Sequence, residues 1–194
     1  DGFDVRRFMA DDGSTEPPLA LNWVPETPLL GKIAVMVGIW ALIVDFVNIA
    51  IGAYASGQKV VWAGFVSYGT FADNTFVAHN GVEISPGDIV FTIIAGIILA
   101  FGALILQKTE EGGVISWITS LVSPKRWAPL FDFSGGMNVT IGSWLLITGI
   151  IFYFAWSITN NTWVDPGVYA VTIPLISFGS ILPMLENESE NADD

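Results

Sequence analysis

Residues 29–54, LLGKIAVMVGIWALIVDFVNIAIGAY, form an apolar run in which the only charged side chains are Lys32 and Asp45. A helix needs about 20 mostly apolar residues to cross a hydrocarbon core of about 30 Å, so this run predicts a membrane span. Three further stretches qualify: 89–107, 138–158 and 167–185. The last contains Pro174, which a membrane helix tolerates when neighbouring groups satisfy the freed carbonyl. The sequence therefore predicts an all-α integral membrane protein with a four-helix transmembrane bundle over residues 29–185.

The composition supports this class of protein. Of the 194 residues, 52% are hydrophobic and only 13% are charged, whereas soluble domains carry about 25% charged residues. The net charge is −12, and the Lys and Arg residues form no cluster that could neutralise phosphates, which excludes nucleic-acid binding. The chain has no cysteine, which excludes disulfides and thiolate metal sites.

The positive charges predict an orientation. Four crossings place both acidic termini, 1–28 and 186–194, on the same side as the loop 108–137. That side carries six of the seven Lys and Arg residues, namely Arg6, Arg7, Lys32, Lys108, Lys125 and Arg126. The loop 55–88 on the other side has Lys59 alone. The positive-inside rule therefore predicts a multi-pass protein with both termini in the cytoplasm.

The outer loop, residues 55–88, is rich in β-branched and aromatic side chains. Asn80-Gly81 is a hairpin signal between short strand-like flanks, so we expect a small β-hairpin on the outer face. A short interfacial helix is the competing interpretation, through Trp62, Phe65 and Tyr68. At the end of this loop, Ser85 and Pro86 predict the cap and first turn of the second membrane helix.

The inner loop, residues 108–137, contains the segment GVISWITSLV. Its apolar residues recur at helical spacing and SPKR follows, so the pattern predicts an amphipathic interfacial helix that ends before Pro124.

Asp45 is the only ionisable residue well inside a predicted span, where an aspartate costs about 2.5–3.5 kcal/mol. Spacing of three or four residues puts small and polar neighbours on its helix face, namely Gly38, Ala41, Asn48 and Gly52. This face should point at protein or at a water-filled cavity. Asp45, oriented by Asn48, is then either an ion ligand or proton carrier, or a hydrogen-bonding residue that holds helices or subunits together.

Other polar and small residues give less specific signals. Ser177 and Ser180, near Pro174, are candidates for lining a cavity, although such hydroxyls often satisfy local carbonyls. The small residues predicted to allow close helix packing are Gly38, Gly52, Gly96, Ala100, Gly142 and Gly149. They serve either the internal bundle or an oligomer.

The sequence offers no obvious cofactor or catalytic site. His79 is the only histidine, and its place beside a predicted turn favours a solvated turn residue over an axial ligand. The chain has no cluster of His or Cys for zinc or copper, no mid-span lysine, no nucleophile motif and no phosphate loop. We therefore expect no metal, no cofactor and no enzymatic activity.

Two hypotheses follow from these patterns. The first is a non-catalytic membrane subunit that packs, within the lipid, against other membrane protein subunits or against copies of itself. The second is a small oligomeric channel or carrier that uses Asp45 and Asn48 as its intramembrane polar site.

Overall fold

The computed structural model describes residues 23–192. Most of the predicted N-terminal segment, including Arg6 and Arg7, and the last two residues of the predicted tail lie outside this range. Four helices within it are long and apolar enough to cross a membrane, as predicted. They are α1 (Pro28–Ala50), α3 (Pro86–Thr109), α6 (Met137–Asn160) and α7 (Pro166–Ala192), whose apolar part is Pro166–Pro183. These helices indicate an integral membrane protein.

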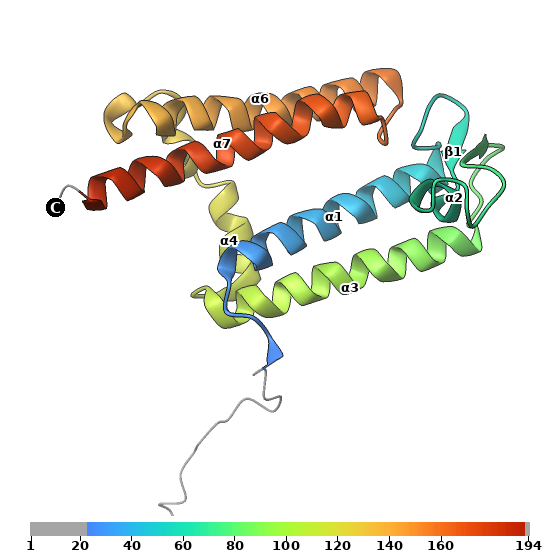
Figure 1. The fold of residues 1–194 in the computed structure, drawn as a ribbon, viewed down its shortest axis with the longest axis horizontal. Coiled ribbons are helices and arrows are strands. Elements are labelled where there is room, and N and C mark those ends of the chain that lie inside the picture. The colour runs from blue at the N-terminus through green and yellow to red at the C-terminus, as the bar shows by residue number, and fades with distance from the viewer. Residues whose placement is uncertain (1–22, 193–194) are drawn as a thin grey trace, which may run out of the picture.

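The four helices form two antiparallel pairs, α1 with α3 and α6 with α7 (Figure 1). The inner connection links them through α4 (Gly113–Leu121), α5 (Pro124–Trp127) and two 3-10 turns, η3 (Ala128–Leu130) and η4 (Phe133–Gly135). The predicted inner helix thus forms and ends before Pro124. We call this end of the fold the inner end and the opposite end the outer end. α1 begins and α7 ends at the inner end, as four crossings require. That the inner end faces the cytoplasm stays a prediction.

Small residues bring α1 and α3 close together. A Cβ added at Gly38 would lie 2.7 Å from the Cβ of Leu99, and one at Gly102 would lie 2.6 Å from the backbone nitrogen of Val35. The contact face of α3 therefore includes Gly102 and the buried Ala95. A Cβ added at Gly96 would meet no atom within 4 Å, and Ala100 is exposed. The small residues predicted on α3 thus lie away from α1.

The second pair packs through glycines on both helices. A Cβ at Gly142 would lie 2.7 Å from Pro183, and one at Gly149 would lie 3.0 Å from Leu175 and Ile176. Gly179 of α7 approaches the backbone of Leu146 in the same way. Gly142 and Gly149 therefore serve the internal α6/α7 contact.

The outer loop differs from the predicted hairpin. Its strands, β1 (Gln58–Val60) and β2 (Phe76–Ala78), pair antiparallel with Val60 opposite Phe76. The helix α2 (Trp62–Val66) lies in the segment of chain that connects the two strands. The turn at Asn80-Gly81 was predicted to join two strands, and this is wrong because β2 ends before it. The expected β element therefore forms, but without that turn. The competing helix forms as well and ends before Tyr68. Burial of Trp62 against α1 and α3 directs the chain after β1 back along the bundle.

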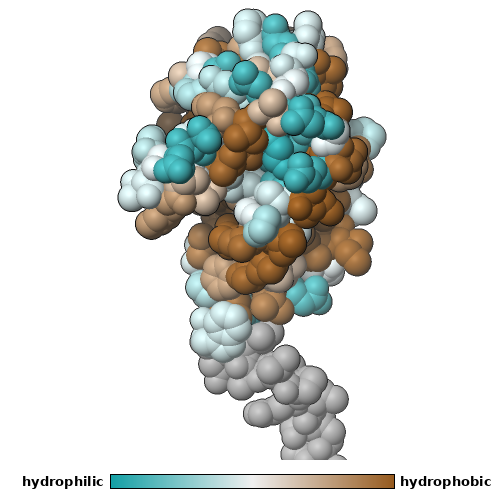
Figure 2. Space-filling view, turned by 90° about the vertical axis from the view of Figure 1, so that its right-hand side faces the viewer, coloured by the Kyte–Doolittle hydropathy of each residue, from teal (hydrophilic) through white to brown (hydrophobic). Residues whose placement is uncertain are grey.

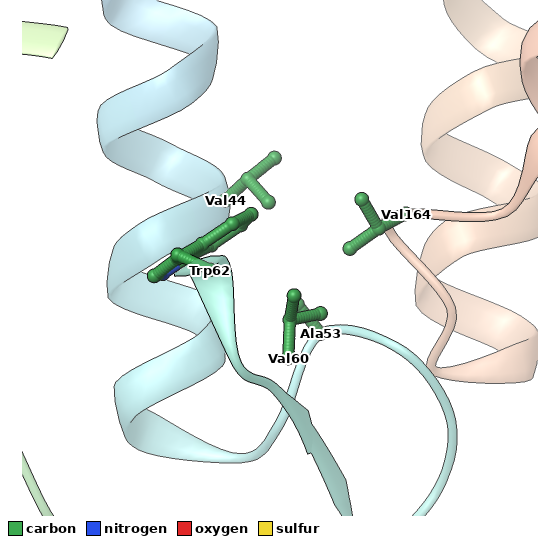
Figure 3. Packing of buried hydrophobic residues seen from close by; sticks show 5 residues of the cluster. All are labelled: Val44, Ala53, Val60, Trp62 and Val164. Carbon is green, nitrogen blue, oxygen red and sulfur yellow. The ribbon is translucent and has the colours of Figure 1, made fainter. Parts of the chain in front are cut away.

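The two helix pairs meet at the outer end. Side chains from α1, the outer loop and the α6–α7 connection form one buried cluster of Val44, Ala53, Val60, Trp62 and Val164 (Figure 3). Beside it, Trp40 Nε1 donates to the Tyr153 hydroxyl at 2.8 Å, and the Trp40 ring meets Tyr169 edge-on. Seen end-on, the outer end carries hydrophilic and hydrophobic residues side by side (Figure 2).

We predict that Gly38→Ala destabilises the fold, because the new methyl group would meet the Leu99 backbone at 2.8 Å, which a side-chain rotation cannot relieve. Overpacking of this kind costs about 1–3 kcal/mol. The free energy of unfolding, measured by reversible denaturation in mixed micelles, checks this. Gly96→Ala is the matched control and should be neutral or slightly stabilising, since alanine favours a helix by about 0.5–1 kcal/mol over glycine. Equal losses in both variants would refute the packing argument.

Candidate functional site

Asp45 lies on α1 about one turn from its outer end and is almost fully buried. Trp62 Nε1 donates to its Oδ1 at 2.7 Å, and the Thr92 hydroxyl of α3 donates to its Oδ2. The Trp62 ring stacks on Phe91, with ring centroids 3.8 Å apart. One carboxylate therefore ties α1, α2 and α3 together.

Asn48 lies one turn further along α1 and is completely buried. Its Nδ2 donates to the Val60 carbonyl at 3.0 Å and to Asp88 Oδ1 at 3.1 Å. Its Oδ1 accepts from the backbone N–H groups of Val60 at 2.7 Å and Ala53 at 3.3 Å. These four bonds use both donors and both acceptor positions of the amide. Asn48 thus anchors β1 and the end of α1 rather than orienting Asp45.

Asp88 and Lys59 also belong to this site, although the sequence patterns did not indicate them. Asp88, in the first turn of α3, is fully buried, and Lys59 Nζ donates to its Oδ2 at 3.1 Å. The same Nζ donates to the Glu83 carbonyl at 3.1 Å. The Ser85 N–H and hydroxyl each donate to Asp88 Oδ2 at 2.7 Å, which completes a capping box. The signals were present in the SPGD sequence and in the single basic residue of the outer loop.

Together these side chains form what we call the outer polar cluster: Asp45, Asn48, Lys59, Trp62, Asp88 and Thr92. It combines two carboxylates with one ammonium in a region of low dielectric, where unpaired charge is expensive. Both oxygens of each carboxylate accept hydrogen bonds from protein groups. The cluster is therefore satisfied internally, and this chemistry suits structural hydrogen bonding.

Two surface depressions lie at the outer end, and neither is lined by a residue of the outer polar cluster. The first is bordered by aromatic and polar side chains, namely Tyr54, Trp156, Asn160, Thr162 and Asp165, together with Ala55 and Pro166. The second is bordered by Phe65, Val66, Tyr68, Thr75, Phe76 and Pro166.

The other predicted site residues lie apart from the cluster. Ser177 and Ser180 are exposed on α7, and the Ser180 hydroxyl donates to the Ile176 carbonyl of its own helix at 2.8 Å. Gly52 has a φ of +84° just after α1, where the helix ends earlier than predicted. A side chain there would also collide with the Gln58 carbonyl, so the tight turn into β1 requires glycine.

His79 differs from the solvated turn residue that was expected. It is half-buried, and its ring Nε2 lies 3.0 Å from the Ile49 carbonyl at the end of α1. Since a carbonyl only accepts, Nε2 must carry the proton in this contact. His79 therefore satisfies one of the free carbonyls at the C-terminal end of α1. Among the side chains that the structure describes, no group of three or more His, Asp or Glu residues is placed to hold a metal ion.

No protein-family model, curated protein or solved structure matches this chain. Its function is therefore inferred from the contacts of the described residues.

We predict that Trp62→Phe lowers the free energy of unfolding, because Asp45 Oδ1 loses its donor in a buried position. A buried acceptor left unpaired costs about 1–3 kcal/mol. Trp163→Phe is the matched control, since the buried Trp163 Nε1 has no hydrogen-bond partner among the described residues. Unfolding in mixed micelles should therefore show a smaller loss for Trp163→Phe. A loss as large as that of Trp62→Phe would mean that indole packing explains both.

We predict that Lys59→Met is strongly destabilising, because it leaves the Asp88 carboxylate buried without its cation. Breaking a buried pair from one side costs about 3–5 kcal/mol. Lys32→Met is the comparison, since Lys32 and Glu110 form a half-exposed pair at 2.6 Å. Such a pair contributes about 0–1 kcal/mol. The same unfolding measurement separates the two variants, and similar losses would show that the Lys59–Asp88 pair is not specially stabilising.

Proposed function

We propose that this chain is a non-catalytic integral membrane subunit that packs against other membrane proteins or against copies of itself. The observation that carries the proposal is the engagement of Asp45 and Asn48 in internal hydrogen bonds. An intramembrane acid is by default a candidate for ion or proton transfer. Here the acid instead holds α2 against α1 and α3, as a structural residue would.

The surface of the second helix pair also supports the proposal. In the most apolar stretch of each helix, 39% of residues are buried in α1, 22% in both α3 and α6, and 17% in α7. Exposed apolar residues on these helices include Trp144, Ile151, Trp156, Ile173 and Phe178. Lipid tails and partner helices are the two environments that suit such a surface, and large aromatic side chains are frequent at protein–protein contacts.

One observation favours the alternative, a small oligomeric channel or carrier. Thr92, whose hydroxyl donates to Asp45 Oδ2, is itself exposed on α3. A single hydrogen bond therefore separates the buried carboxylate from the surface of this chain. In an oligomer, that surface is where a polar pathway would have to run.

We predict that gentle extraction of the native protein followed by chemical cross-linking and mass spectrometry yields partner subunits or a homo-oligomer in stoichiometric amount. In proteoliposomes, neither the unmodified chain nor Asp45→Asn should raise the ion flux above that of protein-free vesicles, at any pH. Recovery of a stable monomer free of partners would contradict the subunit proposal. A flux that the unmodified chain supports and Asp45→Asn abolishes would establish the carrier instead.

A further inference from the structure

One face of α1 is covered at the outer end and uncovered towards the inner end. Trp40 on this face contacts Tyr153 of α6 and Tyr169 of α7. The positions three, four and seven residues earlier lie on the same face of the helix. They are Val37, Met36 and Ile33, and their exposed fractions are 43%, 49% and 45%. The contact between the helix pairs therefore stops near Trp40, and an apolar surface continues from there to the inner end.

The helix α4 crosses from the first pair to the second at the inner end (Figure 1). Its buried Trp117 packs with Val35 and Leu106, which fixes α4 against α1 and α3. A second apolar stripe, Ile115, Ile118 and Val122, follows helical spacing and remains exposed. An amphipathic helix that lies across the bundle in this way belongs at the membrane interface, with its free apolar stripe against acyl chains.

Two basic residues follow α4 directly. Lys125 and Arg126 are exposed on the short helix α5. Trp127 Nε1 donates to the Leu121 carbonyl at 2.8 Å and so holds α5 against the end of α4. Among the side chains that the structure describes, no ion pair involves either cation, whereas Lys32, Lys59 and Lys108 are each paired with a carboxylate. These two positive charges are therefore held beside an uncovered apolar surface.

We propose that the inner end of this fold binds an anionic phospholipid. The guanidinium of Arg126 and the ammonium of Lys125 bind the headgroup phosphate, and the acyl chains lie against the exposed stripe of α4 and the uncovered face of α1. Basic residues between membrane helices at the leaflet surface suit anionic headgroups. A neutral partner helix would cover the apolar surface but would leave both cations unpaired, so charge complementarity favours the lipid.

The test uses the full chain in vesicles of equal parts phosphatidylcholine and phosphatidylglycerol, with the photoreactive residue benzoylphenylalanine replacing Met36. Mass spectrometry of the adduct identifies the lipid class that lies against this face. The same label at Ala100, exposed on α3 at a similar distance from the inner helix ends, reports the surrounding bilayer. We expect phosphatidylglycerol to be enriched at Met36 relative to Ala100.

Three further variants, each combined with the Met36 label, show whether the two cations cause the enrichment. Lys125→Gln/Arg126→Gln should lower the phosphatidylglycerol enrichment by roughly tenfold, since each basic residue near the surface strengthens anionic-lipid binding several-fold. The charge-preserving exchange Lys125→Arg/Arg126→Lys should keep it. Lys32→Gln, which removes a positive charge elsewhere at the inner end, should also keep it.

Any of three results would overturn the proposal. Equal lipid composition at Met36 and Ala100, or enrichment that survives Lys125→Gln/Arg126→Gln, would show that the cations select no lipid. A peptide adduct at Met36 in place of a lipid adduct, from native membranes or from vesicles, would show that a protein covers this face.

Discussion

The amide of Asn48 is the contact on which the outer end of this fold depends. One side chain binds the backbone of Val60 on both its N–H and its carbonyl, caps the turn at Ala53, and donates to Asp88 of α3. In water each bond would contribute only about 0.5–1.5 kcal/mol, because solvent competes for the same groups. Inside the bundle no solvent is available, so a buried polar group without a partner is costly. Asn48 therefore holds β1 against the end of α1, at the point where the chain enters α2.

Asp45 lies one turn further into the helix bundle and is likewise fully engaged in hydrogen bonds. Its carboxylate would be costly at this depth, and the fold offsets that cost with donors from Trp62 and Thr92. The outer loop folds back along α1 and α3, which brings the Trp62 indole within hydrogen-bond distance of Asp45. Stacking of Trp62 on Phe91 stabilises this loop conformation. Apolar packing and polar satisfaction thus require the same conformation, which is typical of sequences that specify one structure. An intramembrane acid can in this way be explained by architecture before transport is considered.

The two ends of the protein are built differently. At the outer end, a shared cluster and the Trp40–Tyr153 contact join the helix pairs. At the inner end they are joined by the connection through α4 and α5. An apolar face of α1 is uncovered there, and Lys125 and Arg126 on α5 form no ion pair with the side chains that the structure describes. The outer end is thus closed by a buried cluster, whereas the inner end keeps an uncovered apolar surface on its side. The lipid-binding proposal draws on that asymmetry, whereas the subunit proposal rests on the internal hydrogen bonds of Asp45 and Asn48.

Local patterns in the sequence were enough to predict the four long helices, the short helix α4 of the inner loop and the Ser85 cap of α3, because hydropathy and capping act within a few residues. They also placed Asp45 and Asn48 on one buried face of α1. Contacts between distant segments decided the rest. Such contacts determine the hydrogen-bond partners of Asp45 and the Lys59–Asp88 pair. They also determine that α3 packs on α1 through Gly102 and not through Gly96, and that the Asn80-Gly81 turn does not join the two strands. Periodicity shows which residues share a face, but only the packing of helices far apart in the chain determines what that face meets.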